Sequence, residues 1–307
     1  MSNISYVFAG QGAAISGMGR DLVSNYPSAR RIFELGSDVL GFDIKALCFE
    51  SDNETLAQTA NTQPAIFTMS LASCAVLSEA GVTPCAVAGF SLGEISALTA
   101  AGAVSLEDGF KIIAARGDCM QRAAQTSDGA MYAVLGLDAA RISEICERVS
   151  GYAIPVNFNS PGQTVLAGES AAAAEAAEAC VAAGAKRAVK LAVNAGFHSA
   201  LMNDASVEFA AKIASITFKT PKIPVYSNTT ALPIDDFSDM PSYLARQMTH
   251  PVRWTDTVMN MRAAGVDTMI EHGPGKVLTG LIKRISTEIS TGNCDNIQNI
   301  DAILQKI

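Results

Sequence analysis

The sequence Gly-Phe-Ser-Leu-Gly at residues 89–93 constrains the fold of this chain more than any other feature. A short apolar run at 86–88 leads into it, and residues 94–101 follow with good helix formers. Ser91 is therefore predicted at a sharp turn from a buried strand into a helix, which is the sequence form of a nucleophile elbow. Free N–H groups at the start of that helix would face an oxyanion formed beside the serine. This context favours a catalytic serine over a chance match in a glycine-containing loop.

Composition limits the architecture and the partners. A chain of 307 residues with 49% hydrophobic and 17% charged residues can form about two domains, or one large domain with an insertion. Abundant alanine and a single tryptophan favour helices packed on a sheet over an all-β sandwich. The net charge is -8 without a basic run, so we expect no nucleic-acid binding, because phosphate contacts need clustered Lys and Arg.

The cysteines and the N-terminus bear on the compartment. The seven cysteines are scattered, odd in number and never spaced C-x-x-C, which predicts small buried hydrophobes rather than disulfides or a metal site. The first residues lack the basic start and apolar core of a signal peptide. The uncharged run 55–78 contains Gln, Asn and Pro, which argue against a membrane span. These features predict a cytoplasmic protein without membrane insertion.

The first part of the chain alternates short strands with helices. An apolar strand at 4–8 ends in a glycine-containing loop around Gln11. Asn61 or Thr62 can cap a helix with Pro64 in its first turn, running to about residue 80. Other helices are predicted at 19–26, 28–40, around 46, and from about 105 to 122.

The pattern changes near residue 128. Strands at 130–136, 153–159, 164–168 and 187–191 and helices at 138–149 and 170–183 follow in the order βαββαβ, which is ferredoxin-like. Afterwards the helix-rich α/β pattern resumes, with strands at 223–227 and 266–271 and helices at 200–214, 240–248, 255–264 and 276–285. We predict a large α/β-hydrolase-like domain with a parallel sheet, formed by residues 1–127 and 197–307. A small ferredoxin-like subdomain, residues 128–196, would be inserted into it.

A serine hydroxyl is a weak nucleophile and needs a base within hydrogen-bond reach. Of three histidines, His272 lies in a Gly-Pro turn and His250 precedes a proline, whereas His198 lies at the junction of the two predicted domains. Ligand clefts form at such junctions, so His198 is the preferred base. The order Ser then His also occurs in α/β-hydrolases, which place a carboxylate before the histidine. No carboxylate is evident here, although Asp204 and others stay open.

Arg116 lies on a predicted helix among apolar neighbours. Such an arginine must extend outward to water or meet an anion inside. On the residues alone, an outward side chain or a plain salt bridge is the commoner outcome.

Eight short segments occur in an order that resembles the family of malonyl-CoA:acyl carrier protein transacylases, which includes the acyltransferase domains of fatty-acid and polyketide synthases. The resemblance covers nearly the whole chain and rests on residues 8–12, 62–65, 89–94, 116–121, 156–163, 197–199, 251–254 and 273–278.

The resemblance implies an enzyme that works by a ping-pong mechanism. Ser91 would take the malonyl group from malonyl-CoA and pass it to the phosphopantetheine thiol of holo acyl carrier protein, supplying fatty-acid elongation. His198 would move the protons. The backbone N–H groups of Gln11 and Leu92 would form the oxyanion hole, and Arg116 would pair with the malonyl carboxylate.

The resemblance also implies supporting residues. Gln247 would orient the histidine in place of a carboxylate. The expected pocket residues are Gln63, Phe90, Met120, Asn159 and Phe197. Phe90 departs from the histidine usual at its position. Phe197 suggests a hypothesis of selectivity, in which its ring fills the space that an α-methyl group would need.

The partners follow from the same resemblance. Carrier proteins are acidic, so a basic rim is needed, and the candidate docking residues are Lys186, Arg187, Lys190, Lys283 and Arg284. No metal or redox cofactor is expected, since the CoA thioester is a substrate, and we expect a monomer. The alternatives are a trans-acting acyltransferase of a polyketide synthase, a serine thioesterase or esterase, and a catalytically silent scaffold.

Overall fold

A parallel five-stranded sheet carries the strand that leads to Ser91. The computed structural model describes residues 3–306. The strands are arranged in the order β7-β2-β1-β8-β9, and every neighbouring pair is parallel. Their bounds are β1 Ile4–Phe8, β2 Ala86–Gly89, β7 Val225–Tyr226, β8 Thr268–His272 and β9 Ser290–Asn293. Because the carboxyl ends of parallel strands meet at one edge, the loop after β1 and the elbow after β2 lie side by side. The predicted parallel sheet is confirmed.

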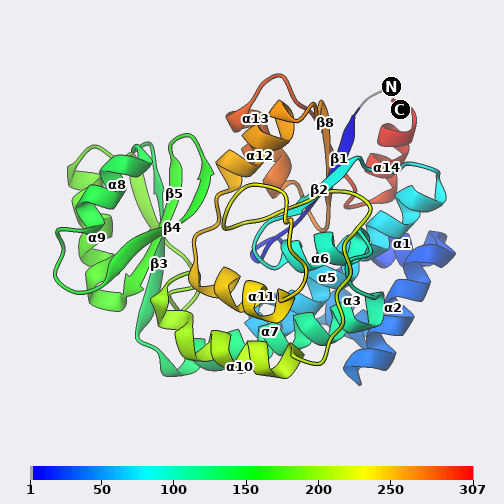
Figure 1. The fold of residues 1–307 in the computed structure, drawn as a ribbon, viewed down its shortest axis with the longest axis horizontal. Helices are drawn as coiled ribbons and strands as arrows, with labels where there is room; N and C mark the ends of the chain where they lie inside the picture. The colour runs from blue at the N-terminus through cyan, green and yellow to red at the C-terminus, as the bar shows by residue number, and fades with distance from the viewer. Residues whose placement is uncertain (1–2, 307) are drawn as a thin grey trace.

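Helices cover this sheet and form the large lobe, which is the right-hand part of Figure 1. The long helices α5 (Thr59–Glu79) and α7 (Leu106–Thr126) pack against each other, with the rings of Phe67 and Phe110 edge to face at 5.0 Å. The remaining helices of this lobe are α1 Arg20–Asn25, α2 Pro27–Leu40, α3 Ile44–Glu50, α4 Asn53–Ala57, α6 Gly93–Ala100, η1 Ala200–Met202, α10 Asn203–Ile213, α11 Met240–Thr249, α12 Trp254–Ala263, α13 Val277–Ile285 and α14 Ile297–Leu304.

The start of α5 differs from the prediction. The helix begins at Thr59, so Pro64 lies inside it rather than in a first turn capped by Asn61 or Thr62. The Thr59 N–H donates to the side-chain oxygen of Gln121 at 2.7 Å, so a distant residue supplies the missing acceptor. The capping prediction was wrong because it considered local side chains only.

A second, antiparallel sheet forms the small lobe, green at the left of Figure 1. Its strands β3 (Gly129–Leu135), β4 (Ala153–Ser160), β5 (Gln163–Glu169) and β6 (Arg187–Lys190) are ordered β4-β5-β3-β6. Helices α8 (Ala139–Cys146) and α9 (Ser170–Ala182) complete the βαββαβ order. Helix α9 buries an alanine-rich face, and α8 buries Ile142, Ile145 and Cys146. The predicted ferredoxin-like arrangement is confirmed.

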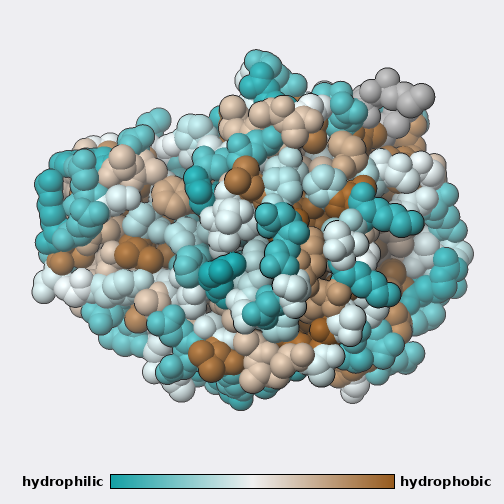
Figure 2. Space-filling view, in the orientation of Figure 1, coloured by the Kyte–Doolittle hydropathy of each residue, from teal (hydrophilic) through white to brown (hydrophobic). Residues whose placement is uncertain are grey.

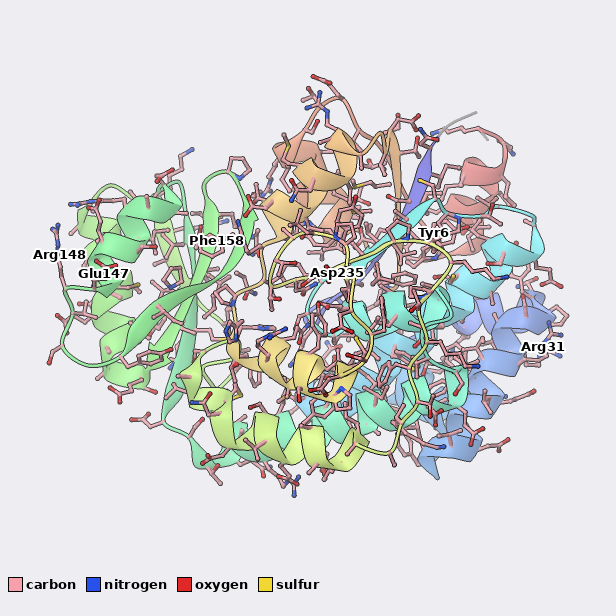
Figure 3. The ribbon with its side chains drawn as sticks, viewed as in Figure 1. Tyr6, Arg31, Glu147, Arg148, Phe158 and Asp235 are labelled. Carbon is pink, nitrogen blue, oxygen red and sulfur yellow. The ribbon has the colours of Figure 1, made fainter. Side chains whose placement is uncertain are left out.

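The two lobes are joined through Val252, which precedes α12. Its N–H donates to the Val156 carbonyl at 2.8 Å, and its carbonyl accepts from the Phe158 N–H at 2.9 Å, so the segment pairs with β4. Figure 3 shows Phe158 on the side of the small lobe that faces the large one. Arg284 on α13 adds a hydrogen bond to Gln163 at 2.8 Å.

Some elements were not anticipated. The strand expected at 223–227 is only two residues long, because Pro224 has no N–H to donate to a ladder. Helices α4 and α14 and strand β9 were missed, and β9 contains Gly and Asn, which are poor strand formers. All seven cysteines are free thiols, and six are buried as predicted, whereas Cys85 is exposed.

The surface gives two further observations. Among residues 3–306, no helix is both long and apolar enough to cross a bilayer. In Figure 2 the outer end of the small lobe is mainly hydrophilic, while hydrophobic residues gather right of centre over the large lobe.

Candidate active site

The elbow at Ser91 is a tight, strained turn. Ser91 has φ 53°, in the left-handed region where a side chain is strained. A Cβ on Gly89 would lie 1.9 Å from the carbonyl carbon of Gly93, and one on Gly93 would lie 2.2 Å from the Phe8 oxygen. Only glycine therefore fits at these two positions, which explains why the serine is flanked as it is.

Asn228, which follows β7, fastens the elbow from the side. Its Oδ1 accepts from the Ser91 N–H at 2.7 Å, and its Nδ2 donates to the Gly89 carbonyl at 2.6 Å. The residue is buried and lies 137 residues from Ser91 along the chain. Nothing local in the sequence indicated this role.

His198 lies against the serine. The Ser91 hydroxyl is 2.8 Å from Nε2, and Nδ1 faces the carbonyl oxygens of Gln247 at 3.0 Å and His250 at 3.2 Å. Two carbonyls can only accept, so Nδ1 carries the proton and Nε2 is free to act as a base. Burial, and secondarily the charge of Arg116, lower the pKa of His198 to about 4, so the ring is neutral at pH 7.

Arg116 is 1% exposed and points into the site. Its Nη2 donates to the Ser91 hydroxyl at 3.2 Å and to Oε1 of Gln247 at 3.1 Å, and its Nη1 donates to Oε1 of Gln63 at 3.0 Å. Within residues 3–306, no carboxylate forms an ion pair with it. The expectation of an outward side chain or a plain salt bridge was wrong. Burial lowers its pKa to about 10, which leaves it charged at pH 7.

Gln247 on α11 connects these three residues. Its Nε2 donates to the Ser91 carbonyl at 2.8 Å, its Oε1 accepts from Arg116, and its backbone carbonyl faces His198. One buried residue thus contacts the serine, the arginine and the histidine.

The two N–H groups expected to bind an oxyanion lie on the neighbouring loops after β1 and β2. In the described part of the chain, neither the Gln11 nor the Leu92 N–H has a hydrogen-bond acceptor. The Gln11 side chain donates to Thr59 at 3.1 Å and fixes its loop, while Leu92 is the N-cap residue of α6. Both donors are therefore available to a ligand.

A cavity of about 450 Å³ opens over Ser91 and His198. Phe90, Met120 and Phe197 line it, as does the segment 191–193 that follows β6, so both lobes contribute to its walls. The ring of Phe90 also packs edge to face on Trp254 at 5.8 Å.

Two of the expected pocket residues lie outside the cavity lining. Gln63 is fully buried behind Arg116, and its Nε2 donates to the sulfur of Met120 at 3.3 Å. Asn159 is buried near the end of β4, where a register irregularity between Phe158 and Ser160 interrupts the alternation, and Asn157 lines the cavity instead.

The basic residues expected at a docking rim are all exposed, and none forms an ion pair within residues 3–306. Lys190 directly precedes the cavity-lining segment 191–193. Lys283 instead lines a separate cavity beside β9. Of the five basic residues, Lys190 therefore lies next to the lining of the cavity over Ser91, whereas Lys283 lies at a different cavity.

Sequence reasoning missed a buried polar layer behind the site. Glu94 is fully buried and accepts from the Tyr243 hydroxyl, the Asn228 N–H at 3.0 Å and Gln247 Nε2 at 3.4 Å. Its position in the Gly89–Glu94 motif was the only available signal. In the described residues, no group of three or more His, Cys, Asp or Glu side chains could hold a metal ion.

Comparison with known proteins defines the class. Residues 5–298 match the family described as acyl transferase domain, and the chain belongs to this family. The resemblance inferred from the ordered motifs is thereby confirmed.

Two relatives of this chain carry the same, more specific name. The chain is 43% identical over 288 residues to the malonyl CoA-acyl carrier protein transacylase of Escherichia coli K12, covering 93% of each chain. It is 37% identical to the Bacillus subtilis protein of the same name, covering 100% of this chain and 98% of that one.

Solved structures of malonyl transferases have the same fold as this chain. A malonyl-transacylase in complex with its type II PKS acyl-carrier protein superposes with a TM-score of 0.96 at 40% identity, covering 100% of both chains. An acyl carrier protein S-malonyltransferase from Vibrio cholerae gives a TM-score of 0.94 at 41% identity, covering 98% of this chain and 100% of that one.

Proposed function

We propose that this protein transfers the malonyl group from malonyl-CoA to the phosphopantetheine thiol of a holo acyl carrier protein through a malonyl ester on Ser91. Membership of the acyl transferase family and the names of its relatives support this reaction.

One observation supports the malonyl group in particular. The guanidinium Nη2 of Arg116 lies 3.2 Å from the Ser91 hydroxyl. In a malonyl ester on that oxygen, the free carboxylate is one methylene away from the ester carbonyl. Such a carboxylate can reach the arginine. A guanidinium holds a carboxylate through two parallel hydrogen bonds, so it orients the acyl group as well as binding it.

In the first half-reaction, Ser91 Oγ attacks the thioester carbonyl while His198 Nε2 takes the hydroxyl proton. The N–H groups of Gln11 and Leu92 stabilise the oxyanion of the tetrahedral intermediate. The C–S bond then breaks, the protonated histidine returns its proton to the sulfur, and CoA leaves as the thiol.

In the second half-reaction, the phosphopantetheine thiol occupies the place that CoA has left. His198 takes the thiol proton, the sulfur attacks the ester carbonyl, and the proton returns to Ser91 as the C–O bond breaks. These steps balance with the residues of the chain alone, so we propose no metal or redox cofactor. Gln63 and Asn159 are assigned a supporting role beneath the pocket.

Intact-mass spectrometry tests this proposal. Mixing the protein with malonyl-CoA should add one malonyl group, which should then move onto holo acyl carrier protein. Ser91→Ala should abolish the adduct. Ser96→Ala is the matched control, because Ser96 is a buried serine on α6 whose hydroxyl has no hydrogen-bond partner in residues 3–306. Free malonate without a carrier adduct would instead identify a hydrolase, and no adduct at all would contradict the proposal.

We propose that the acidic carrier protein docks along β6, through Lys186, Arg187 and Lys190, with Lys283 and Arg284 as an outer pair. Charge reversal on β6 should raise the KM for the carrier protein about tenfold without changing the rate of malonyl-enzyme formation. Arg148→Glu is the control, because Figure 3 shows Arg148 at the outer end of the small lobe. An unchanged carrier-protein KM would contradict the docking site.

The remaining assignments are proposals with their own tests. Transfer rates to a fatty-acid carrier protein and a polyketide carrier protein would separate the two pathways. A monomer is expected in sedimentation, a cytoplasmic location in cell fractionation, and a subdomain of residues 128–196 in limited proteolysis.

A further inference from the structure

Glu94 is a fully buried carboxylate whose hydrogen bonds all come from neutral donors: the Tyr243 hydroxyl, the Asn228 N–H and the Gln247 amide. Burying a charge without an ionic partner is costly, because the interior screens and solvates it poorly. The proton occupancy of Glu94 therefore depends on the other charges around it.

Among residues 3–306, Arg116 is, like Glu94, a buried charge without an ionic partner in hydrogen-bond contact, but its charge is positive. It is a buried cation whose acceptors are neutral oxygens of Gln63, Gln247 and Ser91. Gln247 joins the two charges, since its Oε1 accepts from Arg116 while its Nε2 lies 3.4 Å from Oε2 of Glu94. Before an acyl group is bound, the ionised form of Glu94 and the charge of Arg116 attract each other.

We propose that Glu94 takes up a proton when an acyl carboxylate binds at Arg116, so that the site exchanges one buried negative charge for another. The inference rests on the proposed function, because it requires a carboxylate-bearing acyl group beside Ser91. The incoming carboxylate pairs with the guanidinium and cancels the part of the attraction on ionised Glu94 that the arginine supplied, while the three hydrogen bonds remain. A proton taken from solvent by Glu94 then offsets the negative charge that the acyl group has brought.

The structure contains a route for this proton that avoids the substrate cavity. Tyr243 donates its hydroxyl to Glu94 and also lines a second cavity of about 270 Å³. That cavity is bounded by the loop between α10 and α11, where Figure 3 shows Asp235 at the front of the large lobe. The phenol therefore lies between Glu94 and this second cavity, which shares no lining residue with the cavity over Ser91.

The charged and titratable groups around Glu94 come from several elements. Arg116 on α7 acts on it directly, and Tyr243 on α11 has a raised pKa because of burial and the Glu94 charge. Arg246 stacks over the Tyr243 ring at 5.8 Å, and His198 is coupled to the group through Arg116. Acidic residues of the second cavity are Asp235, Asp236 and Asp239.

The pKa of Glu94 in the absence of an acyl group sets the pH range in which proton uptake should be measurable. Burial raises the pKa of Glu94 to about 7, against the opposing hydrogen bonds and the charge of Arg116. A further rise of about one unit in the pKa of Glu94 increases its proton occupancy at pH 7.5 by about half a proton.

Calorimetry on Ser91→Ala measures this uptake without cleavage of the thioester. Binding enthalpies of malonyl-CoA and acetyl-CoA are compared at pH 7.5 in buffers of different ionisation enthalpy, which yields the protons taken up per ligand. We expect about half a proton for malonyl-CoA and none for acetyl-CoA, whose acyl group brings no carboxylate.

Variants in the same background identify the group. Glu94→Gln should abolish the uptake, whereas Glu271→Gln should preserve it, because Glu271 is a buried carboxylate bound to the start of α13. The Tyr243 hydrogen bond stabilises the ionised form of Glu94, so its loss in Tyr243→Phe should raise the pKa of Glu94. The pH at which proton uptake is greatest should therefore shift upward.

The outcomes separate the two proposals. Equal uptake for both ligands, no uptake for bound malonyl-CoA, or uptake that persists in Glu94→Gln would overturn the role of Glu94. The comparison of two ligands on one protein decides the question even if Glu94→Gln does not fold. Malonyl-CoA binding no tighter than acetyl-CoA would instead count against the proposed function.

Discussion

Replacing Asn228 by alanine tests how the strained elbow is held. The side chain accepts from the Ser91 N–H at 2.7 Å and donates to the Gly89 carbonyl at 2.6 Å. Asn228 is 1% exposed, so water has little access to replace these two bonds. The substitution leaves a buried backbone donor and a buried backbone acceptor without partners on either side of a residue with positive φ.

The expected loss follows from the two orphaned groups. Each buried polar group left unpaired costs about 1–3 kcal/mol, so Asn228→Ala, which orphans two, should lower the free energy of unfolding by about 2–6 kcal/mol. Part of this cost is avoided if Ser91 relaxes from its left-handed conformation, but the hydroxyl then moves away from His198. Malonyl-enzyme formation should therefore slow by about 10-fold to 100-fold, because small misplacements of a nucleophile are costly.

Urea unfolding and rapid-quench measurement of malonyl-enzyme formation provide the two readouts. Asn260→Ala is the matched control, because that side chain donates one bond of 2.9 Å to the Ala231 carbonyl away from the elbow. The control should lose about 1 kcal/mol and keep its rate. If Asn228→Ala matched the control in both stability and rate, the idea that Asn228 holds the elbow would be wrong.

Three further predictions concern the charge, the pocket and the pH dependence. Arg116→Ala should slow malonyl transfer by about 100-fold or more through the loss of charged hydrogen bonds, while acetyl transfer is spared; an equal fall in both acyl-transfer rates would contradict the carboxylate role. Phe197→Ala should raise methylmalonyl over malonyl turnover by about tenfold, measured by competition, and an unchanged ratio would leave the ring a packing residue. Burial lowers the pKa of His272 from 6.5 to about 3, so its contribution to stability is complete above pH 6.5 and is lost as the pH falls toward 3. His272→Gln should therefore flatten the dependence of the unfolding free energy on pH below 6.5 by about 1.4 kcal/mol per pH unit, and an unchanged slope would contradict this origin.

The parts of the fold that were predictable are those with strong local causes. The parallel sheet follows from short apolar strands joined by helices, and the ferredoxin-like order follows from regular alternation between residues 128 and 196. The elbow was predictable because Gly89 and Gly93 have no room for a Cβ. The opposite case is the start of α5, where Gln121 supplies the acceptor for the Thr59 N–H from another helix.

The parts of the site that were not predictable depend on distant residues. Asn228 and Tyr243 have no local motif, and they meet the elbow only because β7 and α11 pack beside β2 and α6. Arg116 shows the limit most clearly. Hydropathy alone favours an outward arginine, but its acceptors come from α5, α11 and the elbow, which no local pattern reveals.

The placement of carboxylates distinguishes this site from that of a serine hydrolase. A hydrolase sets a carboxylate behind its histidine, where it stabilises the imidazolium. Here two carbonyl oxygens face Nδ1 of His198, and the buried carboxylate Glu94 stands behind Gln247 and Arg116 instead.

We expect the pKa of His198 to depend on which acyl group is bound. The charge of Arg116 contributes to the lowered pKa of His198, so a malonyl carboxylate paired with the arginine would shift that pKa back upward. The histidine would then be more basic in the malonyl-enzyme, when it must take the proton of an incoming thiol, than in the free enzyme. A neutral acyl group would leave the arginine unpaired and the base weak. Selectivity for malonyl would therefore arise in the deprotonation of the acceptor as well as in binding.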